Sequence, residues 1–221
     1  MSFSDEWEQT YKAGAHISVW PWSDLVSLVM RHSRPKSSDF RVLELGFGAG
    51  ANIRLFEELG VLFYGMDGSP SVVQRVSERF PQLKDRLIAG DFTKEIPFSG
   101  EFDLIVDRGS ITCNPTQDIE RCLKMLHAKL RTGGVFIGVD WISSEHSDRQ
   151  IGTKTDDDFT YKLFPHGQYA GIGKLHFSDE THLLSLFKEF ELIFLDHKTT
   201  KVHFPKANHQ LATWNIVVRK S

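Results

Sequence analysis

From Phe40 onwards, apolar and polar residues follow two different patterns along the chain. Short, nearly continuous apolar runs are typical of buried strands, whereas an apolar residue at every third or fourth position is typical of an amphipathic helix. The alternation of such runs with helical segments predicts a parallel sheet with right-handed crossovers. The runs predict strands at 40–45, 61–66, 87–89, 102–107, 135–140, 190–195 and 211–218.

Helix boundaries follow from capping residues and from glycines. Ser69 followed by Pro70 is a favourable helix start, and the apolar residues behind it recur on one face. Thr116 opens another helix, which the glycine pair 133–134 is expected to end. Ser178 is expected to cap the last helix of the chain.

Two segments depart from this alternation. Residues 5–32 are expected to be helical with a break at Gly14, and their many aromatic rings either cap a cleft or merely pack the segment onto the domain. Residues 141–177 lack regular periodicity, but their aromatic content argues against disorder, so we expect this insertion to act as a lid. We interpret 1–221 as a single domain with a helical cap (1–35), a ligand-binding core (36–140), the lid insertion (141–177) and a terminal helix and strand pair (178–221).

The composition fits one globular domain. Of 221 residues, 40% are hydrophobic and 25% charged, which suffices for a substantial core. The formal net charge of −3 gives no long-range attraction for phosphate backbones, and the basic cluster 31–36 resembles a linker, so no nucleic acid partner is expected. No apolar run approaches the ~20 residues that a bilayer requires, and no leader pattern is present, which predicts a cytoplasmic protein without a membrane partner. Cys113 and Cys122 are expected to be free thiols.

The segment from Phe40 to Gly50 places three glycines between an expected strand and an expected helix. At such a crossover, glycines take positive φ and let backbone amides approach a ligand at a helix N-terminus. The turn therefore predicts a site for a nucleotide-type cofactor. Gly46, Gly48 and Ala51 also satisfy the dinucleotide fingerprint, which keeps an NAD(P)-dependent oxidoreductase as an alternative.

Carboxylates also follow the second and third expected strands. Asp67 ends the second strand, where it suits the ribose hydroxyls of either cofactor. Asp91 and Phe92 follow the third strand and could both meet a purine. The nicotinamide alternative explains Asp67, but it does not explain Asp91 with Phe92.

Together with 133–134 and the apolar segment 213–218, these motifs resemble the class I S-adenosylmethionine-dependent methyltransferases, well over residues 36–140 and more loosely over the last forty. The resemblance implies an α/β, Rossmann-like, doubly wound and mostly parallel seven-stranded sheet. It also implies an antiparallel C-terminal strand, a helical N-terminal cap, and S-adenosylmethionine as cofactor. Asn52 and the segment 214–220 further resemble the tellurite-resistance and thiopurine branches of this superfamily.

Carried over by position, the resemblance implies which residues hold the cofactor. Glu44 and the glycine turn would hold its methionine end, Asp67 its ribose, and Asp91 with Phe92 its adenine. Phe47 stands where many relatives carry a smaller residue, which is expected to reshape the turn without removing it. The implied set is Glu44, Gly46, Phe47, Gly48, Gly50, Asn52, Asp67, Gly68, Ser69, Asp91, Phe92, Asp107 and Arg108.

The acceptor is expected to be a small molecule with an oxygen, nitrogen or sulfur nucleophile. Methyl transfer from a sulfonium needs a base only where the nucleophile must lose a proton, so a sulfur or neutral amine, which needs alignment alone, is favoured. The histidines show no metal-ligand spacing, and no metal is expected. Candidate bases are Asp107, His146, His166 and His176.

Several alternatives stay open at this stage. Asp140 also ends an expected strand, and the acidic triple 156–158 either attracts a cationic amine or is simply solvated. A non-catalytic cofactor-binding protein is a further alternative, against which the intact Glu44, Asp67 and Asp91 argue. The sequence is compatible with a monomer and with a homodimer.

Overall fold

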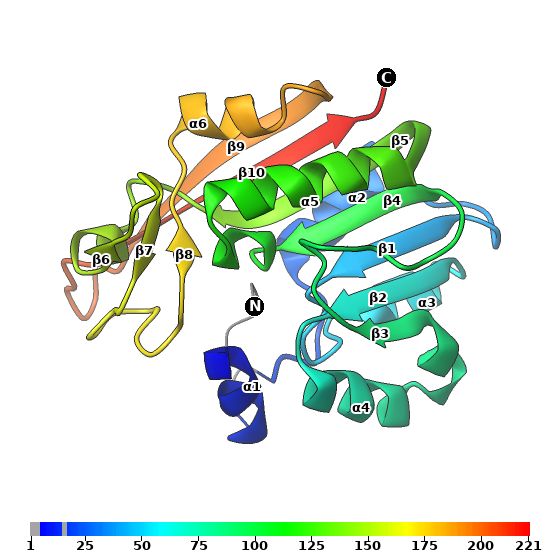
Figure 1. Ribbon diagram of the computed structural model, residues 1–221, viewed down its shortest axis with the longest axis horizontal. Helices are drawn as coiled ribbons and strands as arrows, with labels where there is room; N and C mark the ends of the chain where they lie inside the picture. The colour runs from blue at the N-terminus through cyan, green and yellow to red at the C-terminus, as the bar shows by residue number, and fades with distance from the viewer. Residues whose placement is uncertain (1–4, 15–16) are drawn as a thin grey trace.

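The computed structural model describes residues 5–14 and 17–221 (Figure 1). At their centre, these residues form a seven-stranded sheet in the order β3-β2-β1-β4-β5-β10-β9. Strands β1 to β5 pair in parallel, and β10 runs antiparallel to both β5 and β9, which confirms the expected sheet. The strands are β1 (Arg41–Leu45), β2 (Leu62–Asp67), β3 (Leu87–Ala89), β4 (Phe102–Arg108), β5 (Leu130–Ile142), β9 (Glu191–Lys201) and β10 (Gln210–Arg219).

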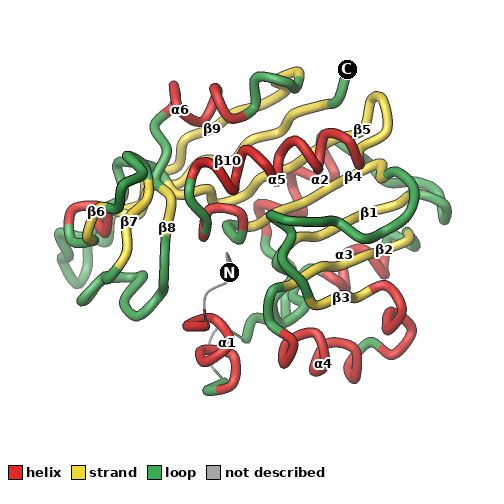
Figure 2. Tube along the Cα trace, in the orientation of Figure 1, coloured by secondary structure: helices red, strands yellow, loops and turns green. Residues whose placement is uncertain are grey.

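Helices cover both faces of the sheet, so the molecule has three layers, with the helices in red and the strands in yellow in Figure 2. One apolar core lies between the sheet and α5 with α6, and it contains Phe136 and Trp141. The other lies between the sheet and α2, α3 and α4, and it contains Phe56 and Phe63. The layer helices are α2 (Ser23–His32), α3 (Ile53–Glu58), α4 (Pro70–Arg79), α5 (Thr116–Lys129) and α6 (Glu180–Leu186), and the 3-10 turns are η1 (Pro81–Arg86), η2 (Ile111–Cys113) and η3 (Ser147–Gln150).

The N-terminal segment differs from the expected helical cap. Helix α1 (Asp5–Lys12) is followed by residues 17–22, which have no regular secondary structure, before α2 begins. Helix α2 buries Leu25, Leu28 and Val29 in the core, because apolar residues three and four positions apart lie on one helix face. The second half of the expected cap is therefore a packing helix of the sheet.

The sequence predicted that the glycine pair 133–134 ends α5, but the structure shows otherwise. Helix α5 ends at Lys129, and the chain passes directly into β5. Both glycines lie inside β5 at an irregularity opposite β4, where Gly133 N donates to Lys220 O (2.8 Å) and Lys220 N donates to Gly134 O (3.0 Å). The glycines thus form a bulge that pairs with the C-terminal segment.

The insertion folds into a small antiparallel sheet of β6 (Thr153–Lys154), β7 (Thr160–Lys162) and β8 (Leu175–His176). It has an apolar cluster of its own, in which Phe164 and Phe177 are buried. The carboxylate of Asp157 accepts hydrogen bonds from the backbone N (2.5 Å) and the hydroxyl (2.9 Å) of Thr116, which caps α5. The middle residue of the acidic triple therefore joins the insertion to the core.

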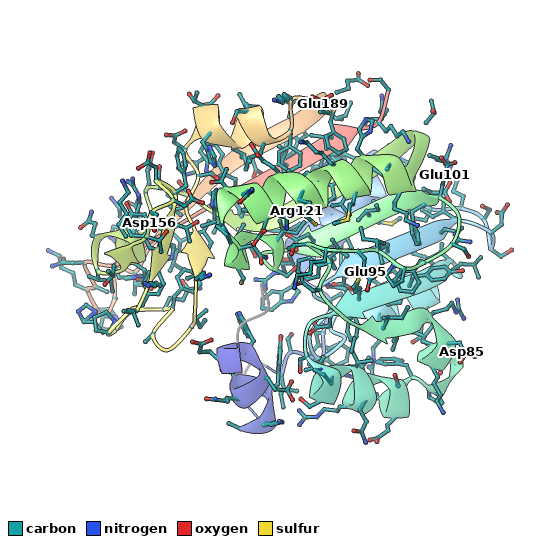
Figure 3. All side chains as sticks on the ribbon, in the orientation of Figure 1. Asp85, Glu95, Glu101, Arg121, Asp156 and Glu189 are labelled. Atoms are coloured by element: carbon teal, nitrogen blue, oxygen red, sulfur yellow. The ribbon has the colours of Figure 1, made fainter. Side chains whose placement is uncertain are left out.

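The chain changes direction across the sheet between β1 and β4. After β1 it adds β2 and β3 on one side, and it then crosses to β4 on the other. In open α/β sheets, ligands bind outside the carboxyl ends of the strands at such a switch point. Charged side chains of both signs cover the remaining surface, among them Asp85, Arg121 and Glu189 in Figure 3. Among the described residues, no helix combines the length and apolarity that crossing a membrane requires.

Candidate active site

A cavity of about 460 Å³ opens at the switch point. The turns that follow β1, β2, β3 and β4 line it, and α1 and residues 17–22 contribute further side chains. This volume lies within the range of small-molecule and cofactor sites. The cavity joins the regions that the sequence predicted to hold a cofactor.

Two glycines of the turn after β1 have no room for a side chain. Gly46 has a φ of +62°, and a Cβ atom there would lie 2.2 Å from the Cβ of Ser110 in the turn after β4. Gly48 has a φ of +51°, and a Cβ atom there would lie 3.0 Å from the hydroxyl of Tyr11 on α1. Two neighbouring elements therefore pack directly against the backbone of this turn.

Phe47 leaves this turn intact, as expected. Its ring is buried in the core next to Gly65 on β2, where a Cβ atom would lie 2.6 Å from the ring. Because Gly65 has no side chain, the ring of Phe47 fits beside it. Phe47 also lines the cavity.

Glu44 brings a buried carboxyl group to the cavity. Its Oε1 accepts a hydrogen bond from Asn52 Nδ2 (2.7 Å), and Asn52 Oδ1 accepts one from Trp22 N (3.2 Å). Its Oε2 is buried and has no hydrogen-bond partner among the described residues. Burial raises the pKa of Glu44 to about 8. An unpaired buried acceptor of this kind suits a cationic ammonium group of a ligand.

Asp67 links the glycine turn to the start of α4. Its two oxygens accept backbone hydrogen bonds from Gly48 and from Ser69, each 2.9 Å long. Burial raises the pKa of Asp67 to about 6, against these two hydrogen bonds, which lower it. Asp67 and Gly68 line the cavity, and the carboxylate retains lone pairs for ligand hydroxyls.

Ser69 differs from its predicted place in the cofactor site. It is fully buried, it caps α4 by accepting a hydrogen bond from Val72 N (3.2 Å), and its hydroxyl bonds to Glu8 on α1. Because it does not line the cavity, it acts as a structural residue that joins α1 to α4.

The turn after β3 forms a third part of the wall. Asp91 and Phe92 both line the cavity, together with Gly90. Asp91 accepts hydrogen bonds from Thr93 N (3.0 Å) and Thr93 Oγ1 (2.7 Å) and pairs with Lys94 at 2.9 Å. These contacts fix the orientation of its carboxylate.

Asp107 lies at the carboxyl end of β4, as the sequence predicted, but it does not line the cavity. It is fully buried, and both of its oxygens are used: one by Ser110 and Ile111, the other by Trp141 Nε1 at 2.8 Å. Burial raises its pKa to about 6. Its hydrogen bonds hold the turn after β4.

Arg108 does line the cavity, as predicted. Its guanidinium lies 3.5 Å from the ring centroid of Trp22 and 2.7 Å from Asp140. Asp140 also pairs with Lys198 (2.7 Å), and these two cations hold its pKa below the ordinary value although burial alone would raise it. Asp140 is therefore a paired anion and not a base.

The three candidate histidines lie away from the cavity. None of His146, His166 and His176 lines it. Burial lowers the pKa of His176 to about 3, and this residue bonds through Nε2 to His182 at 2.9 Å. The insertion that carries them reaches the cavity region only through its apolar cluster, against which Trp7 and Cys113 pack.

Sequence reasoning did not assign two cavity residues of the turn after β4 to the site. Ser110 and Asn114 line the cavity beside Cys113. Their position directly after a strand was the available signal, because parallel strands deliver the following residues to this edge. From α1, Trp7 and Tyr11 line the cavity with ring centroids 5.7 Å apart.

Comparison with known protein sequences agrees with this geometry. A family model described as a methyltransferase domain matches residues 42–134. One curated relative, the 18S rRNA (guanine-N(7))-methyltransferase bud23 of Schizosaccharomyces pombe, is 27% identical over 120 residues, which are 50% of this chain and 44% of that protein. The match thus spans about half the length of this curated relative.

Solved structures share the fold. A SAM-dependent methyltransferase of Methanosarcina mazei has a TM-score of 0.67 at 15% identity, over 91% of this chain and 98% of its own. TehB of Haemophilus influenzae has a TM-score of 0.63 at 14% identity, and the match covers 97% of this chain and 67% of TehB. Phosphoethanolamine N-methyltransferase 2 of Haemonchus contortus, solved with S-adenosyl-L-methionine, has a TM-score of 0.64 at 15% identity. That match covers 98% of this chain and 56% of the enzyme.

At such identities the structural similarity shows the fold alone, so the finer placement near the tellurite-resistance or thiopurine branch stays a prediction. The methyltransferase model, by contrast, matches the segment that forms the glycine turn and the turns after β2, β3 and β4. The nicotinamide alternative finds no such support. Residues 42–134 therefore form a methyltransferase domain, in a chain that has the fold of S-adenosylmethionine-dependent methyltransferases.

Proposed function

We propose that this protein transfers the methyl group of S-adenosylmethionine to a small-molecule acceptor. The observation that carries the proposal is the cavity at the switch point, into which Glu44 presents an unpaired buried oxygen and to which Asp67 and Asp91 add carboxylates. These three acidic groups follow three adjacent strands of the sheet. They complement a ligand with an ammonium group, ribose hydroxyls and an adenine amino group.

We assign each part of the cofactor to one turn. Glu44 Oε2 would accept from the ammonium of the methionine end, and Asp67 from the ribose hydroxyls. Asp91 would accept from the adenine amino group while Phe92 packs against the base. When bound, the cofactor supplies a sulfonium-activated methyl group, and the protein supplies its orientation and the exclusion of water.

The apolar wall of the cavity favours a small acceptor. Trp7 and Tyr11 of α1, together with Ile17 and Trp22, form an apolar wall opposite the glycine turn. A wall of this kind suits a molecule that enters the cavity whole. In this proposal, α1 and residues 17–22 take over the lid role that the sequence assigned to the insertion 141–177.

An RNA acceptor is the second candidate, because the curated relative is named as an 18S rRNA methyltransferase. Charge argues against it here. The net charge is −3, and the basic cluster 31–36 precedes β1, so it lies at the opposite edge of the sheet from the cavity. In the described part of the chain, the charged residues that line the cavity are three carboxylates, Glu44, Asp67 and Asp91, and one guanidinium, Arg108.

Transfer proceeds in line and needs no acid. A lone pair of the acceptor forms the new bond to the methyl carbon, the carbon–sulfur bond breaks, and sulfur keeps the electron pair as the neutral thioether of S-adenosylhomocysteine. Among the described residues that line the cavity there is no histidine. Burial raises the pKa of Tyr11 and brings that of Cys113 to about 12, so neither ionises readily near neutral pH. We therefore favour a sulfur or neutral-amine nucleophile.

Transfer of tritium from methyl-labelled cofactor tests the acceptor class. The protein would be incubated with a small-molecule extract and, separately, with total RNA, and S-adenosylhomocysteine would be quantified in each. We expect label in low-molecular-weight products and none in RNA. Label confined to RNA would replace the small-molecule proposal by the RNA alternative, and turnover in neither extract would contradict it.

A further inference from the structure

A cluster of metal-ligating side chains lies where the insertion meets the loop before β10, outside the cavity. His146, Asp148 and His209 each bring one ligand atom to the same place, and all three atoms lie within 4.8 Å of one another. His146 and Asp148 are buried and flank the start of η3, whereas His209 is about one-third exposed and directly precedes β10. More than sixty positions separate Asp148 from His209, so no sequence spacing reveals the cluster.

We propose that His146, Asp148 and His209 bind a divalent transition-metal ion of the Zn²⁺ class, which ties the insertion to the loop before β10. Two imidazoles and one carboxylate are ligand types that Zn²⁺ prefers, and three protein ligands leave one position for water. The partial exposure of His209 provides an entry path. This site is independent of methyl transfer and lies apart from the residues that line the cavity.

Two of the three ligands are held by partners of the kind that support metal sites. His146 contacts Gln168 Oε1 through Nε2 at 3.2 Å, and when Nε2 donates that hydrogen bond, Nδ1 carries the lone pair that faces Asp148. Asp148 Oδ2 accepts a hydrogen bond from Tyr169 N (2.8 Å), which leaves Oδ1 facing both histidines. Partners of this type orient ligand atoms, and their loss typically weakens metal affinity about 10- to 100-fold.

The distances between the ligand atoms lie on either side of the distance expected when an ion is bound. With metal–ligand bonds of about 2.0–2.2 Å, two ligand atoms on one tetrahedral ion lie roughly 3.3 Å apart. His146 Nδ1 lies 3.9 Å from Asp148 Oδ1, and His209 Nε2 lies 2.5 Å from the same oxygen. Loading the site requires His209 to move outward, and its place in a partly exposed loop allows this. It also requires His146 Nδ1 to exchange its hydrogen bond from Asp148 N (3.1 Å) for the metal.

The position of the cluster gives the ion a structural role. In Figure 1 the loop between β9 and β10 runs beside β6 and β7, at the far end of the molecule from β3. The ring of His146 also lies 5.0 Å from that of Tyr169, which packs on the apolar cluster of the insertion. An ion here would join η3, the 167–169 segment and the loop before β10 at one point.

Calorimetry with Zn²⁺ tests this proposal without any activity assay. Wild-type protein, freed of metal by a chelator, would be titrated with Zn²⁺ alone, beside the variants His209→Ala and Asp148→Asn. His203→Ala serves as the matched control, because His203 is exposed and lies in the same loop. We expect one Zn²⁺ per chain in the wild type and the control, and affinity at least about a hundredfold weaker in both cluster variants.

Absorption of bound Co²⁺ gives a second readout, which reports the coordination of the ion. A site with two imidazoles and a carboxylate gives visible bands of four- or five-coordinate Co²⁺ in the wild type, and these bands should vanish in His209→Ala but persist in His203→Ala. Zn²⁺ binding of equal strength in all four proteins would assign it to scattered surface histidines and overturn the proposal. Absence of binding in folded wild type would show a hydrogen-bonded cluster only and would overturn it too.

Discussion

Single side chains define the chemistry of the cavity, and Glu44 is the most informative of them. Its folded-state pKa of about 8 means that it is mostly protonated at neutral pH before a ligand binds. The cofactor ammonium requires the carboxylate form, so binding should release a proton. Affinity should therefore rise with pH up to about 8.

Calorimetry with S-adenosylhomocysteine in two buffers of different ionisation heat measures that proton. We predict a buffer-dependent binding heat for the wild type at pH 7. Glu44→Gln should make the heat independent of the buffer and weaken binding by about 1.5–3 kcal/mol, the range for a charge-assisted hydrogen bond. A buffer-independent heat in the wild type would show that Glu44 is not the ammonium acceptor.

Asp67 should contribute to both binding and folding. In Asp67→Ala the ligand loses an acceptor, and the backbone N–H groups of Gly48 and Ser69 lose theirs as well. We predict weaker binding of S-adenosylhomocysteine by about 1.5–3 kcal/mol together with a lower melting temperature. Asp85→Ala, an exposed position in η1, is the control and should change neither. Unchanged affinity would refute the ribose assignment.

The sequence predicted which carboxyl groups lie at the strand ends, but it predicted their roles only in part. Asp67 and Asp91 were found because a carboxylate at or just after the end of a strand lies at the carboxyl edge of the sheet, whereas Glu44, inside β1, was assigned through the family resemblance. Asp107 obeys the same rule, yet Trp141 and Ser110 reach its oxygens from elsewhere in the fold. No local sequence pattern predicts those partners, so only the structure could show that Asp107 positions the turn after β4.

At the scale of elements, α1 is the segment whose position matters most for the cavity. It is held by the hydrogen bond between Glu8 and Ser69 Oγ and by the bond from Arg75 to Tyr11 O (3.4 Å). Only one helical turn separates these anchors from the rings that line the cavity. Release of α1 should therefore open the cavity to solvent.

Glu8→Ala is expected to speed dissociation of S-adenosylhomocysteine about three- to tenfold, because α1 loses one hydrogen bond of a charged group that is partly exposed. Fluorescence of the cavity tryptophans, followed by stopped flow, measures this rate. Glu6→Ala, an exposed position on the same helix, is the control and should leave the rate unchanged. Equal rates in Glu8→Ala and wild type would contradict the lid role of α1.

The elements of the sheet followed from periodicity, whereas the N-terminal segment and the insertion did not. Helix α2 shows the apolar spacing of any helix, and the spacing alone does not say whether it packs on the sheet or over a cleft. In the insertion, short strands such as β6 and β8 have two residues each, too few for a period-2 pattern. Tertiary pairing with neighbouring segments fixes them instead.

At the scale of the whole molecule, buried carboxyl groups should govern the pH dependence of stability. Glu44 has a pKa raised to about 8, and Asp67 and Asp107 have pKa values raised to about 6. The folded state binds these protons more tightly than the unfolded state does. Their stabilisation is therefore complete at acidic pH and is lost as the pH rises through these folded values.

We predict that the melting temperature of the cofactor-free protein falls between pH 5 and pH 8. S-adenosylhomocysteine should flatten this decline, because its ammonium stabilises ionised Glu44. Thermal melts at four pH values, with and without the ligand, measure both effects. A melting temperature that climbs steadily over this range would mean that the lowered pKa values of the histidines His146, His176 and His182 dominate instead.

The central claim is that the cavity at the switch point binds S-adenosylmethionine, and calorimetric titration of the folded wild type tests it most directly. S-adenosylmethionine and S-adenosylhomocysteine would be titrated separately, with NADH as the comparison ligand. We predict one site per chain for both S-adenosyl compounds and no binding of NADH. Binding of NADH alone, or no heat from either S-adenosyl compound at millimolar concentration, would contradict the account.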